Sequence, residues 1–170
     1  CMITTAQKRG KVQNDHLDAA VRSMQTLNAI GATLSAMPGV HAMTDVTGFG
    51  LLGHLLEMCQ GSGTQAEVHG EEVQTFEGVP DYHSQGMVPG GARRNFASYG
   101  AHVDVPEGYL RDLLCDPQTS GGLLVSVCPD HADEVTKVLA DAGCPHRPVG
   151  RMLREDESLK EGVTVAYRPS

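Results

Sequence analysis

Residues 42–54, with the sequence AMTDVTGFGLLGH, constrain the fold of this chain more than any other segment. A short apolar run ends in Thr44 and Asp45, a turn interrupted by glycines follows, and an amphipathic helix is predicted from Leu51 to about Gln60. This order places a carboxylate and a row of free backbone N–H groups at a helix N-terminus, which suits phosphate and a hard metal ion. The segment is not a Walker loop, because no Gly-Lys-Ser/Thr sequence follows its glycines.

The composition predicts one domain with an aliphatic core. Of the 170 residues, 40% are apolar and only 4% are aromatic, and Trp is absent. The net charge of −8 argues against a nucleic-acid-binding surface and against docking on an anionic membrane. No apolar run approaches the roughly 20 residues of a membrane helix, and no signal peptide is visible. We therefore expect a cytoplasmic protein with neither a nucleic-acid nor a membrane partner.

The cysteines indicate reduced thiols rather than a disulfide framework or a zinc ribbon. Their number is odd and none forms a C-x-x-C pair. The chain begins with Cys1 instead of Met, and residues 1–3 are interpreted as the end of a strand that starts upstream. We therefore expect this polypeptide to be a piece of a longer one. The five positions are Cys1, Cys59, Cys115, Cys128 and Cys144.

The order of predicted elements is that of an α+β domain in which helices cover a mixed β-sheet. A long helix is predicted from a cap at Asn14 or Asp15 to the Pro38-Gly39 stop, and Pro106 is predicted to open a short helix. Two more helices are predicted at residues 51–60 and 129–142, which gives about four in all, and residues 81–86 are a candidate for a further short helix. Strands are predicted at residues 40–44, 65–69, 123–128, 146–153 and 163–167, the third buried on both faces, with a charged loop at 154–161.

Three irregular segments hold most of the unusual residues: 44–50, 89–95 and 116–122. Each combines glycines with polar side chains, so each is either an ordinary turn or part of a shared ligand site. Asp45 is the best metal candidate, because Mg²⁺ takes one or two carboxylates together with substrate phosphate oxygens. The alternative for Asp45 is a helix-capping or turn aspartate that needs no metal.

Asp116 has the same two interpretations, and we favour the structural one. It precedes Pro117 and is therefore held extended, so that its carboxylate can cap the turn that contains Thr119 and Ser120.

Five further side chains have both a functional and a structural interpretation. Arg93 and Arg94 either meet a phosphate or acidic partner or form a solvated surface pair. Asn95 can bind either a ligand or the backbone. Cys115 is interpreted as a buried inert thiol, since no His or Lys lies near it in the sequence. His54, in the first turn of its helix, is interpreted as a packed or capping neutral histidine.

The three segments, extended to TDVTGFGLLGH (44–54), PGGARRNFASYG (89–100) and LLCDPQTSGGLL (113–124), closely resemble the C-terminal half of bacterial selenophosphate synthetase, or selenide, water dikinase. Their order and spacing fit as well, and the resemblance runs through nearly the whole chain. It implies the C-terminal α+β fold of the wider aminoimidazole ribonucleotide synthetase group. It also implies an enzyme that converts ATP, selenide and water to selenophosphate, AMP and phosphate.

The resemblance further implies a two-domain subunit of which the N-terminal ATP-binding domain is absent here. Residues 1–13 are then a remnant of the interdomain connection, and residues 14–170 are a single C-terminal domain that is inactive alone. Mg²⁺ and ATP both require the absent domain. The implied partners are that domain, ATP and selenide as substrates, and a second subunit in a homodimer.

Carried over residue by residue, Asp45 matches the magnesium-binding aspartate of the family, whereas no catalytic residue of the family lies in this chain. Ala92 replaces the usual Thr and removes one hydroxyl group. The resemblance implies two further sets of site residues. The phosphate-facing set is Thr44, Thr47, Gly48, Gly50 and Asn95, and the set that shapes the floor of the interdomain cleft is Asp116, Thr119, Ser120 and Gly121.

Two other functions stay open from the sequence. The chain can be the C-terminal domain of another ATP-dependent member of the group, such as a purine-synthesis ligase or a hydrogenase-maturation protein. It can also be a binding or assembly module without chemistry of its own. Selenide-dependent AMP formation by the full-length protein discriminates against the first, and an intact upstream ATP domain discriminates against the second.

Overall fold

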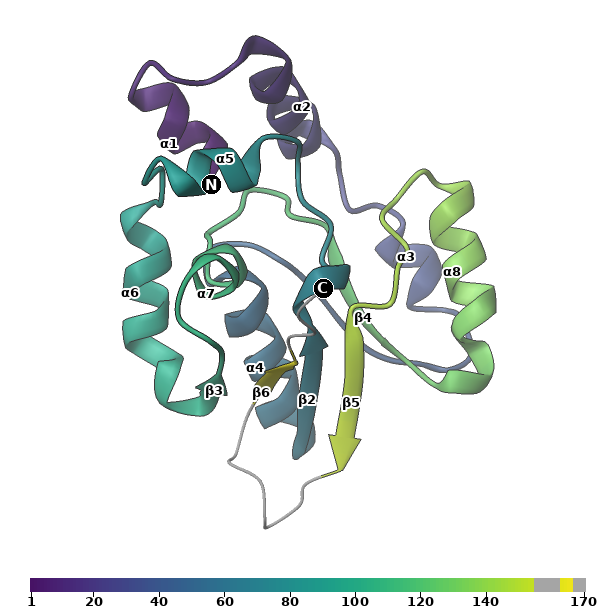
Figure 1. The fold of residues 1–170 in the computed structure, drawn as a ribbon. Helices are drawn as coiled ribbons and strands as arrows, with labels where there is room; N and C mark the ends of the chain where they lie inside the picture. Colours follow the sequence, from purple (N-terminus) through teal and green to yellow (C-terminus); the bar gives the residue numbers. More distant parts are fainter. Residues whose placement is uncertain (155–162, 167–170) are drawn as a thin grey trace.

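The computed structural model describes residues 1–154 and 163–166, so most of the predicted loop at 154–161 lies outside the described residues. A four-stranded sheet in the order β3-β6-β2-β5 forms the centre of the molecule (Figure 1). β2 is antiparallel to β5 and parallel to β6, and β3 is parallel to β6, so the sheet is mixed, as predicted. The strands are β2 (Thr64–His69), β3 (Val103–Asp104), β5 (Gly150–Arg154) and β6 (Val163–Ala166).

A second, two-stranded sheet carries the predicted site. β1 (Val40–Asp45) pairs antiparallel with β4 (Leu123–Val127), and Asp45 lies opposite Leu123. Both strands occur where the sequence predicts them, but the prediction that the strand at 123–128 is buried on both faces is wrong. The residues of β4 are all only partly buried, because each strand of this ribbon has a single strand neighbour.

Helix α4 (Gly50–Ser62) packs against β2 and forms the main core. Its predicted position is confirmed, and Gly63 ends it in the left-handed conformation. Leu52 and Cys59 of α4 are almost completely buried. Each fully buried Leu contributes about 1.5–3 kcal/mol to folding, so this face of α4 fixes the start of the helix relative to the sheet. The core around α4 also contains Leu55, Leu56, Ala66, Val68, Ala92, Leu114, Cys115 and Val163.

A second core joins three helices at the N-terminal end of the chain: α1 (Met2–Lys8), α2 (Asn14–Gln25) and α5 (Val79–Ser84). Residues 1–3 are therefore not the end of a strand: Met2 and Ile3 lie in α1 with exposed fractions of 1% and 0%. Their apolar side chains are buried by α2 and α5 rather than by a sheet, which is why a helix forms there.

The predicted long helix from residue 14 is wrong beyond Gln25. Thr26 is extended, Leu27 is 83% exposed, and helix resumes only as the short α3 (Gly31–Leu34). Apolar residues keep their helical spacing through this break, but Leu27 is not covered by another element. The expected capping aspartate or asparagine is also absent, since Gln13 is the N-cap and makes no side-chain cap bond.

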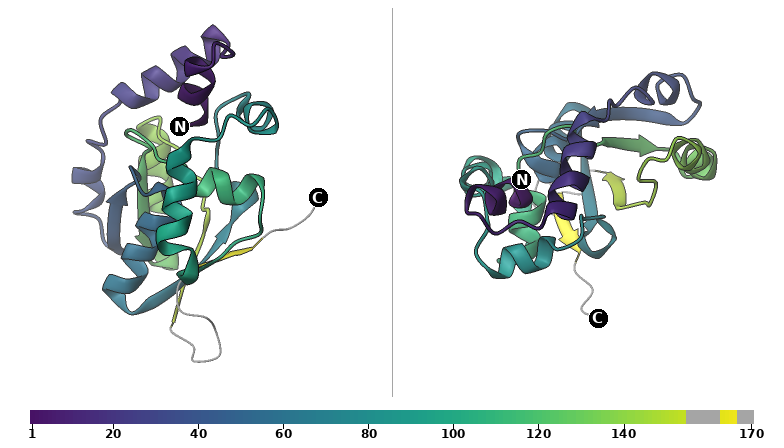
Figure 2. Two further views of the ribbon diagram at one scale, coloured as in Figure 1. Left: turned by 90° about the vertical axis from the view of Figure 1, so that its left-hand side faces the viewer. Right: turned by 90° about the horizontal axis from the view of Figure 1, so that it is seen from above.

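The described residues contain eight α-helical segments, twice the number expected, because short helices leave little periodicity to detect. The segment at 89–95, expected to be a turn, is the start of α6 (Gly90–Tyr99). α7 (Tyr109–Leu114) begins after Gly108 rather than at Pro106. In Figure 1, α6 lies beyond the β3 edge of the four-stranded sheet and α8 (Ala132–Asp141) lies beyond its β5 edge, and the two views of Figure 2 agree. Among the described residues, no helix combines the length and hydropathy needed to cross a membrane.

Candidate functional site

Two of the three predicted segments lie side by side, as extensions of the β1–β4 pair. The amide of Val46 donates to the Gly122 carbonyl at 2.9 Å, and the amide of Gly121 donates back to the Val46 carbonyl at 3.0 Å. The carbonyl of Thr47 then accepts the amide of Gln118 at 3.0 Å. Segments 44–50 and 116–122, more than 65 residues apart in the chain, thus form one continuous backbone surface.

Asn95 brings in the third segment. Its Nδ2 atom donates to the Gly48 carbonyl at 2.8 Å and to the Cys115 carbonyl at 2.9 Å. One turn further along α6, the Tyr99 hydroxyl donates to the Phe49 carbonyl at 2.7 Å. α6 therefore fixes both other segments. Of the two interpretations of Asn95, binding of a ligand or of the backbone, its side-chain nitrogen has the second. Tyr99 was not recognised from the sequence, where only its helical spacing from Asn95 could have indicated it.

Glycine is required at the start of α4. Gly50 has φ +72, and a Cβ atom there would lie 2.7 Å from the backbone carbon and 3.0 Å from the Cα of Cys115, and 2.8 Å from the Leu114 carbonyl oxygen. The neighbouring Gly48 has open space around it. α4 therefore begins in direct contact with the end of α7, and this contact sets the position of the loop at residues 46–49.

Asp45 ends β1 with an exposed side chain. Within residues 1–154 and 163–166, no hydrogen bond or ion pair engages its carboxylate, so the carboxylate is available to a ligand. The same residues contain no group of three or more His, Cys, Asp or Glu side chains that could hold a metal ion by themselves. One exposed carboxylate fits Mg²⁺ only if substrate phosphates and further residues complete the coordination.

Asp116, by contrast, is buried, with an exposed fraction of 3%. Its Oδ2 atom accepts the amide of Met2 at 3.0 Å and the side-chain amide of Gln118 at 2.9 Å. Its Oδ1 atom lies 3.3 Å from the amino group of Cys1 but has no hydrogen-bond partner among the described residues. Burial raises the pKa of this carboxyl, and the amino group opposes that rise. The carboxylate ties α1 to the loop, and its partners are not the predicted Thr119 and Ser120.

The remaining residues of segment 116–122 surround this anchor. Ser120 has φ +50, and its hydroxyl donates to the Thr26 carbonyl at 2.6 Å. Gly121 allows close approach to β1, since a Cβ atom there would lie 2.7 Å from the Val46 carbonyl oxygen. Thr119 is exposed.

His54 is packed in α4, as expected, but with partners that the sequence analysis did not predict. Its Nε2 atom lies 3.0 Å from the Thr47 hydroxyl, and its Nδ1 atom lies 3.1 Å from a carboxylate oxygen of Glu57. The spacing i, i+3 of His54 and Glu57 on a predicted helix was the available signal for this pair.

Cys115 is an inert thiol, as expected. It is fully buried, and burial raises its pKa above that of a free thiol. Since the thiolate is the nucleophile, this environment suppresses its reactivity. Tyr99, which hydrogen-bonds to the Cys115 thiol, likewise has its pKa raised by burial.

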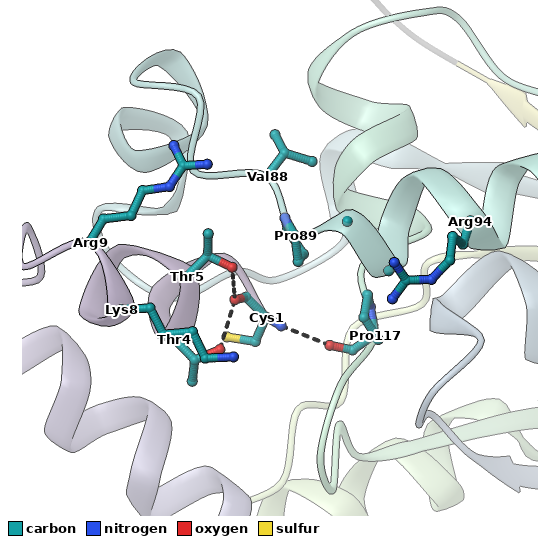
Figure 3. A pocket seen from close by; sticks show the side chains of 11 residues that line it. Cys1, Thr4, Thr5, Lys8, Arg9, Val88, Pro89, Arg94 and Pro117 are labelled. Atoms are coloured by element: carbon teal, nitrogen blue, oxygen red, sulfur yellow. Dashed lines mark hydrogen bonds between the residues drawn. The ribbon is translucent and has the colours of Figure 1, made fainter.

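A basic pocket of about 430 Å³ lies between α1 and the start of α6 (Figure 3). Lys8, Arg9 and Arg94 contribute positive side chains, and none of its lining residues is acidic. At its base the amino group of Cys1 donates to the Pro117 carbonyl at 3.0 Å. Arg93 does not line this pocket and is exposed on α6. Arg94, of the two predicted arginines, thus lies where an anion could approach.

Comparison with known proteins agrees with this architecture. The chain is 50% identical to a selenide, water dikinase of Aeromonas hydrophila over 151 residues, covering 89% of this chain and 44% of the relative. It is 46% identical to that of Haemophilus influenzae over 157 residues, covering 92% and 45%. The chain thus spans less than half the length of these relatives.

A crystal structure of thiamine-monophosphate kinase from Stenotrophomonas maltophilia superposes with a TM-score of 0.65 at 17% identity, over 96% of this chain and 45% of the other. At this identity the likeness concerns the fold alone, and it confirms the predicted fold class. The profile of AIR synthase related proteins, C-terminal domain, matches residues 3–160. The chain therefore belongs to the AIR synthase related protein family, as a C-terminal domain of that family.

Proposed function

We propose that this chain is the C-terminal domain of a selenide, water dikinase, which converts ATP, selenide and water to selenophosphate, AMP and phosphate. The proposal is supported by identities of 46–50% to proteins of that name along about nine-tenths of the chain. Residues 14–170 form the domain, and residues 1–13 lead in from an N-terminal ATP-binding domain. The full-length protein acts in the cytoplasm as a homodimer, and the isolated chain is inactive.

The observation that carries the proposal is the free carboxylate of Asp45 at the end of β1, beside a loop held by the two other segments. Asp45 would hold Mg²⁺ together with the phosphates of ATP and groups of the N-terminal domain. When bound, the ion neutralises charge that develops on the transferred phosphoryl group. The residues of this chain hold the loop beside the ligand in place. The hydrogen bonds from Asn95 and Tyr99 fix the backbone of Gly48 and Phe49 before a ligand arrives.

The phosphate-facing set of Thr44, Thr47, Gly48, Gly50 and Asn95 is proposed to border this site. Asp116, Thr119, Ser120 and Gly121 are proposed to shape the floor of the cleft between the two domains. The basic pocket lined by Arg94 adds positive potential nearby, which attracts a polyanion such as ATP.

The test is the substitution Asp45→Asn in the full-length protein, with AMP measured by chromatography in the presence and absence of selenide. We expect the rate of selenide-dependent AMP formation to fall by at least about 100-fold, with the unfolding midpoint unchanged. Asp18→Asn, an exposed aspartate on α2, is the matched control and should retain the full rate. Near-normal turnover by Asp45→Asn removes Asp45 from the site. Absence of selenide-dependent AMP from the unmodified protein rejects the proposed function.

A further inference from the structure

A row of three hydrogen-bonded side chains runs from the candidate site into α4. The Thr47 hydroxyl lies 3.0 Å from His54 Nε2, and His54 Nδ1 lies 3.1 Å from Glu57 Oε2. His54 is 8% exposed, and the ring of Phe49 lies against it with the centroids 5.7 Å apart. The Glu57 side chain is 59% exposed and Thr47 is half-buried, so solvent reaches the row mainly at its two ends.

The carboxylate end determines where the protons lie. An ionised carboxylate accepts hydrogen bonds and cannot donate one, so the Nδ1 atom of His54 must carry the hydrogen that it shares with Glu57. In a neutral imidazole the Nε2 atom is then bare and accepts. The only hydrogen left for the contact between Nε2 and Thr47 belongs to the Thr47 hydroxyl. Thr47 therefore donates inward to His54, and the lone pairs of its oxygen remain available on the other side.

The backbone holds Thr47 in this orientation. Its carbonyl accepts the amides of Gly50 at 3.1 Å and Gln118 at 3.0 Å. The extended pairing with segment 116–122 continues through Val46, whose side chain is buried. Thr47 therefore lies two residues beyond Asp45, in the part of the loop that is bonded to segment 116–122.

We propose that Thr47 holds a water molecule beside the phosphates as a hydrogen-bond acceptor, and that His54 is the positioning residue that turns the hydroxyl this way. The inference rests on the proposed function. An oxygen that presents only lone pairs attracts a donor and cannot donate to a phosphate oxygen, so Thr47 faces the phosphates through a water molecule. Water is a donor, and it is named with selenide as a substrate of the relatives. A water that donates to Thr47 keeps a lone pair free for attack on the phosphorus of the diphosphate. The attack forms the new P–O bond of inorganic phosphate and breaks the bond to the oxygen that leaves with AMP, and the protons of the water go to the phosphate product and to solvent.

The first experiment tests the proton arrangement in this chain without any activity. With ¹⁵N-labelled histidine, long-range ¹H–¹⁵N spectra distinguish a protonated nitrogen from a bare one in the imidazole ring. We expect neutral His54 to carry its hydrogen on Nδ1, with Nε2 bare. Glu57→Gln, at an exposed position, should make this tautomer less populated, whereas Gln60→Glu on the same helix should leave it unchanged. A hydrogen on Nε2 in the unmodified chain overturns the inference.

The second experiment uses the full-length protein and measures ADP and AMP separately. Each turnover transfers two phosphoryl groups. With selenide as the first acceptor, its attack on the terminal phosphorus of ATP forms selenophosphate and leaves ADP, and attack of water on the terminal phosphorus of ADP forms phosphate and leaves AMP. A variant impaired only at the water step therefore stops at ADP. We expect Thr47→Val to lower AMP formation by about 100-fold with ADP released in its place, and with the KM for ATP changed less than about threefold. Thr47→Ser should restore AMP to within about threefold of the original rate.

The positioning role of His54 has its own signature. His54→Asn keeps a donor near Glu57 but loses the contact with Thr47, so it should also release ADP, and adding Thr47→Val should make it no worse. His41→Asn, exposed on β1, is the control. Equal losses of ADP and AMP in the Thr47→Val protein, or additive losses in the double variant, overturn the inference. Absence of AMP from the unmodified protein rejects only the proposed function, because the spectra of the first experiment still decide the tautomer.

Discussion

The junction between Gly50 and Cys115 allows a quantitative test of how the site is built. Gly50→Ala places a methyl group in a left-handed backbone conformation, which disfavours L-residues by about 1–2 kcal/mol. The methyl also meets backbone atoms at 2.7, 2.8 and 3.0 Å, and such overpacking costs about 1–3 kcal/mol. Reduced freedom of the unfolded chain offsets about 0.4–1 kcal/mol. We therefore expect a net loss of about 2–4 kcal/mol in the free energy of unfolding.

Two other glycines separate these contributions. Gly63 also has a positive φ, but a Cβ atom there meets nothing within 4 Å, so Gly63→Ala should lose only about 1 kcal/mol. Gly48 has neither a positive φ nor a close neighbour, and Gly48→Ala should change stability by less than about 0.5 kcal/mol. Urea unfolding of the three variants gives the comparison, with a midpoint about 1 M or more lower for Gly50→Ala. If Gly50→Ala is no less stable than Gly63→Ala, the proposed contact between α4 and the end of α7 is wrong.

Three further outcomes are expected. Asn95→Ala removes two hydrogen bonds to carbonyls and should destabilise the chain by about 2 kcal/mol in urea unfolding, whereas the exposed Asn14→Ala should not; equal values would contradict the role of Asn95 as a clamp. Cys59 and Cys115, both buried and with raised pKa values, should react with iodoacetamide only on unfolding, after the partly exposed Cys1, Cys128 and Cys144, as peptide mass mapping will show. Burial raises the pKa of Asp116 above 3.8, so protonation of this carboxyl stabilises the folded state, and that stabilisation is lost as the pH rises through the raised pKa. The free energy of unfolding should therefore fall from about pH 4 upward relative to that of Asp116→Asn. Parallel curves of unfolding free energy against pH for the two proteins would contradict this prediction.

Local patterns were sufficient for the elements nearest the site. The glycine-interrupted turn after Asp45 and the apolar spacing of α4 each depend on neighbours within a few residues, and both were predicted correctly. The same reasoning failed between residues 25 and 30, where the apolar spacing continues but Leu27 faces solvent. Spacing reports which side chains could share a face, and only a partner element determines whether that face is buried.

The N-terminal helix illustrates a second limit. Met2 and Ile3 are apolar in any conformation, and three residues carry too little pattern to distinguish a strand from a helix. The burial of both side chains against α2 and α5 makes them helical here. The start of α6 was read as a turn for a similar reason, because Pro89, Gly90 and Gly91 are turn residues that also occur at helix N-termini.

Residue types and their order were enough to single out Asp45, Asn95 and Asp116 as candidates, since carboxylates and amides beside glycines either bind ligands or bond to the backbone of turns. Their actual partners could not be derived in that way. Asn95 bonds two carbonyls 67 positions apart, Asp116 bonds Met2 from the far end of the chain, and the Thr47 hydroxyl lies 3.0 Å from His54 Nε2. Hydrogen bonds depend on distances of a few tenths of an ångström between atoms that folding brings together. The sequence gives the type of each side chain directly, whereas these distances are set only when distant segments pack together.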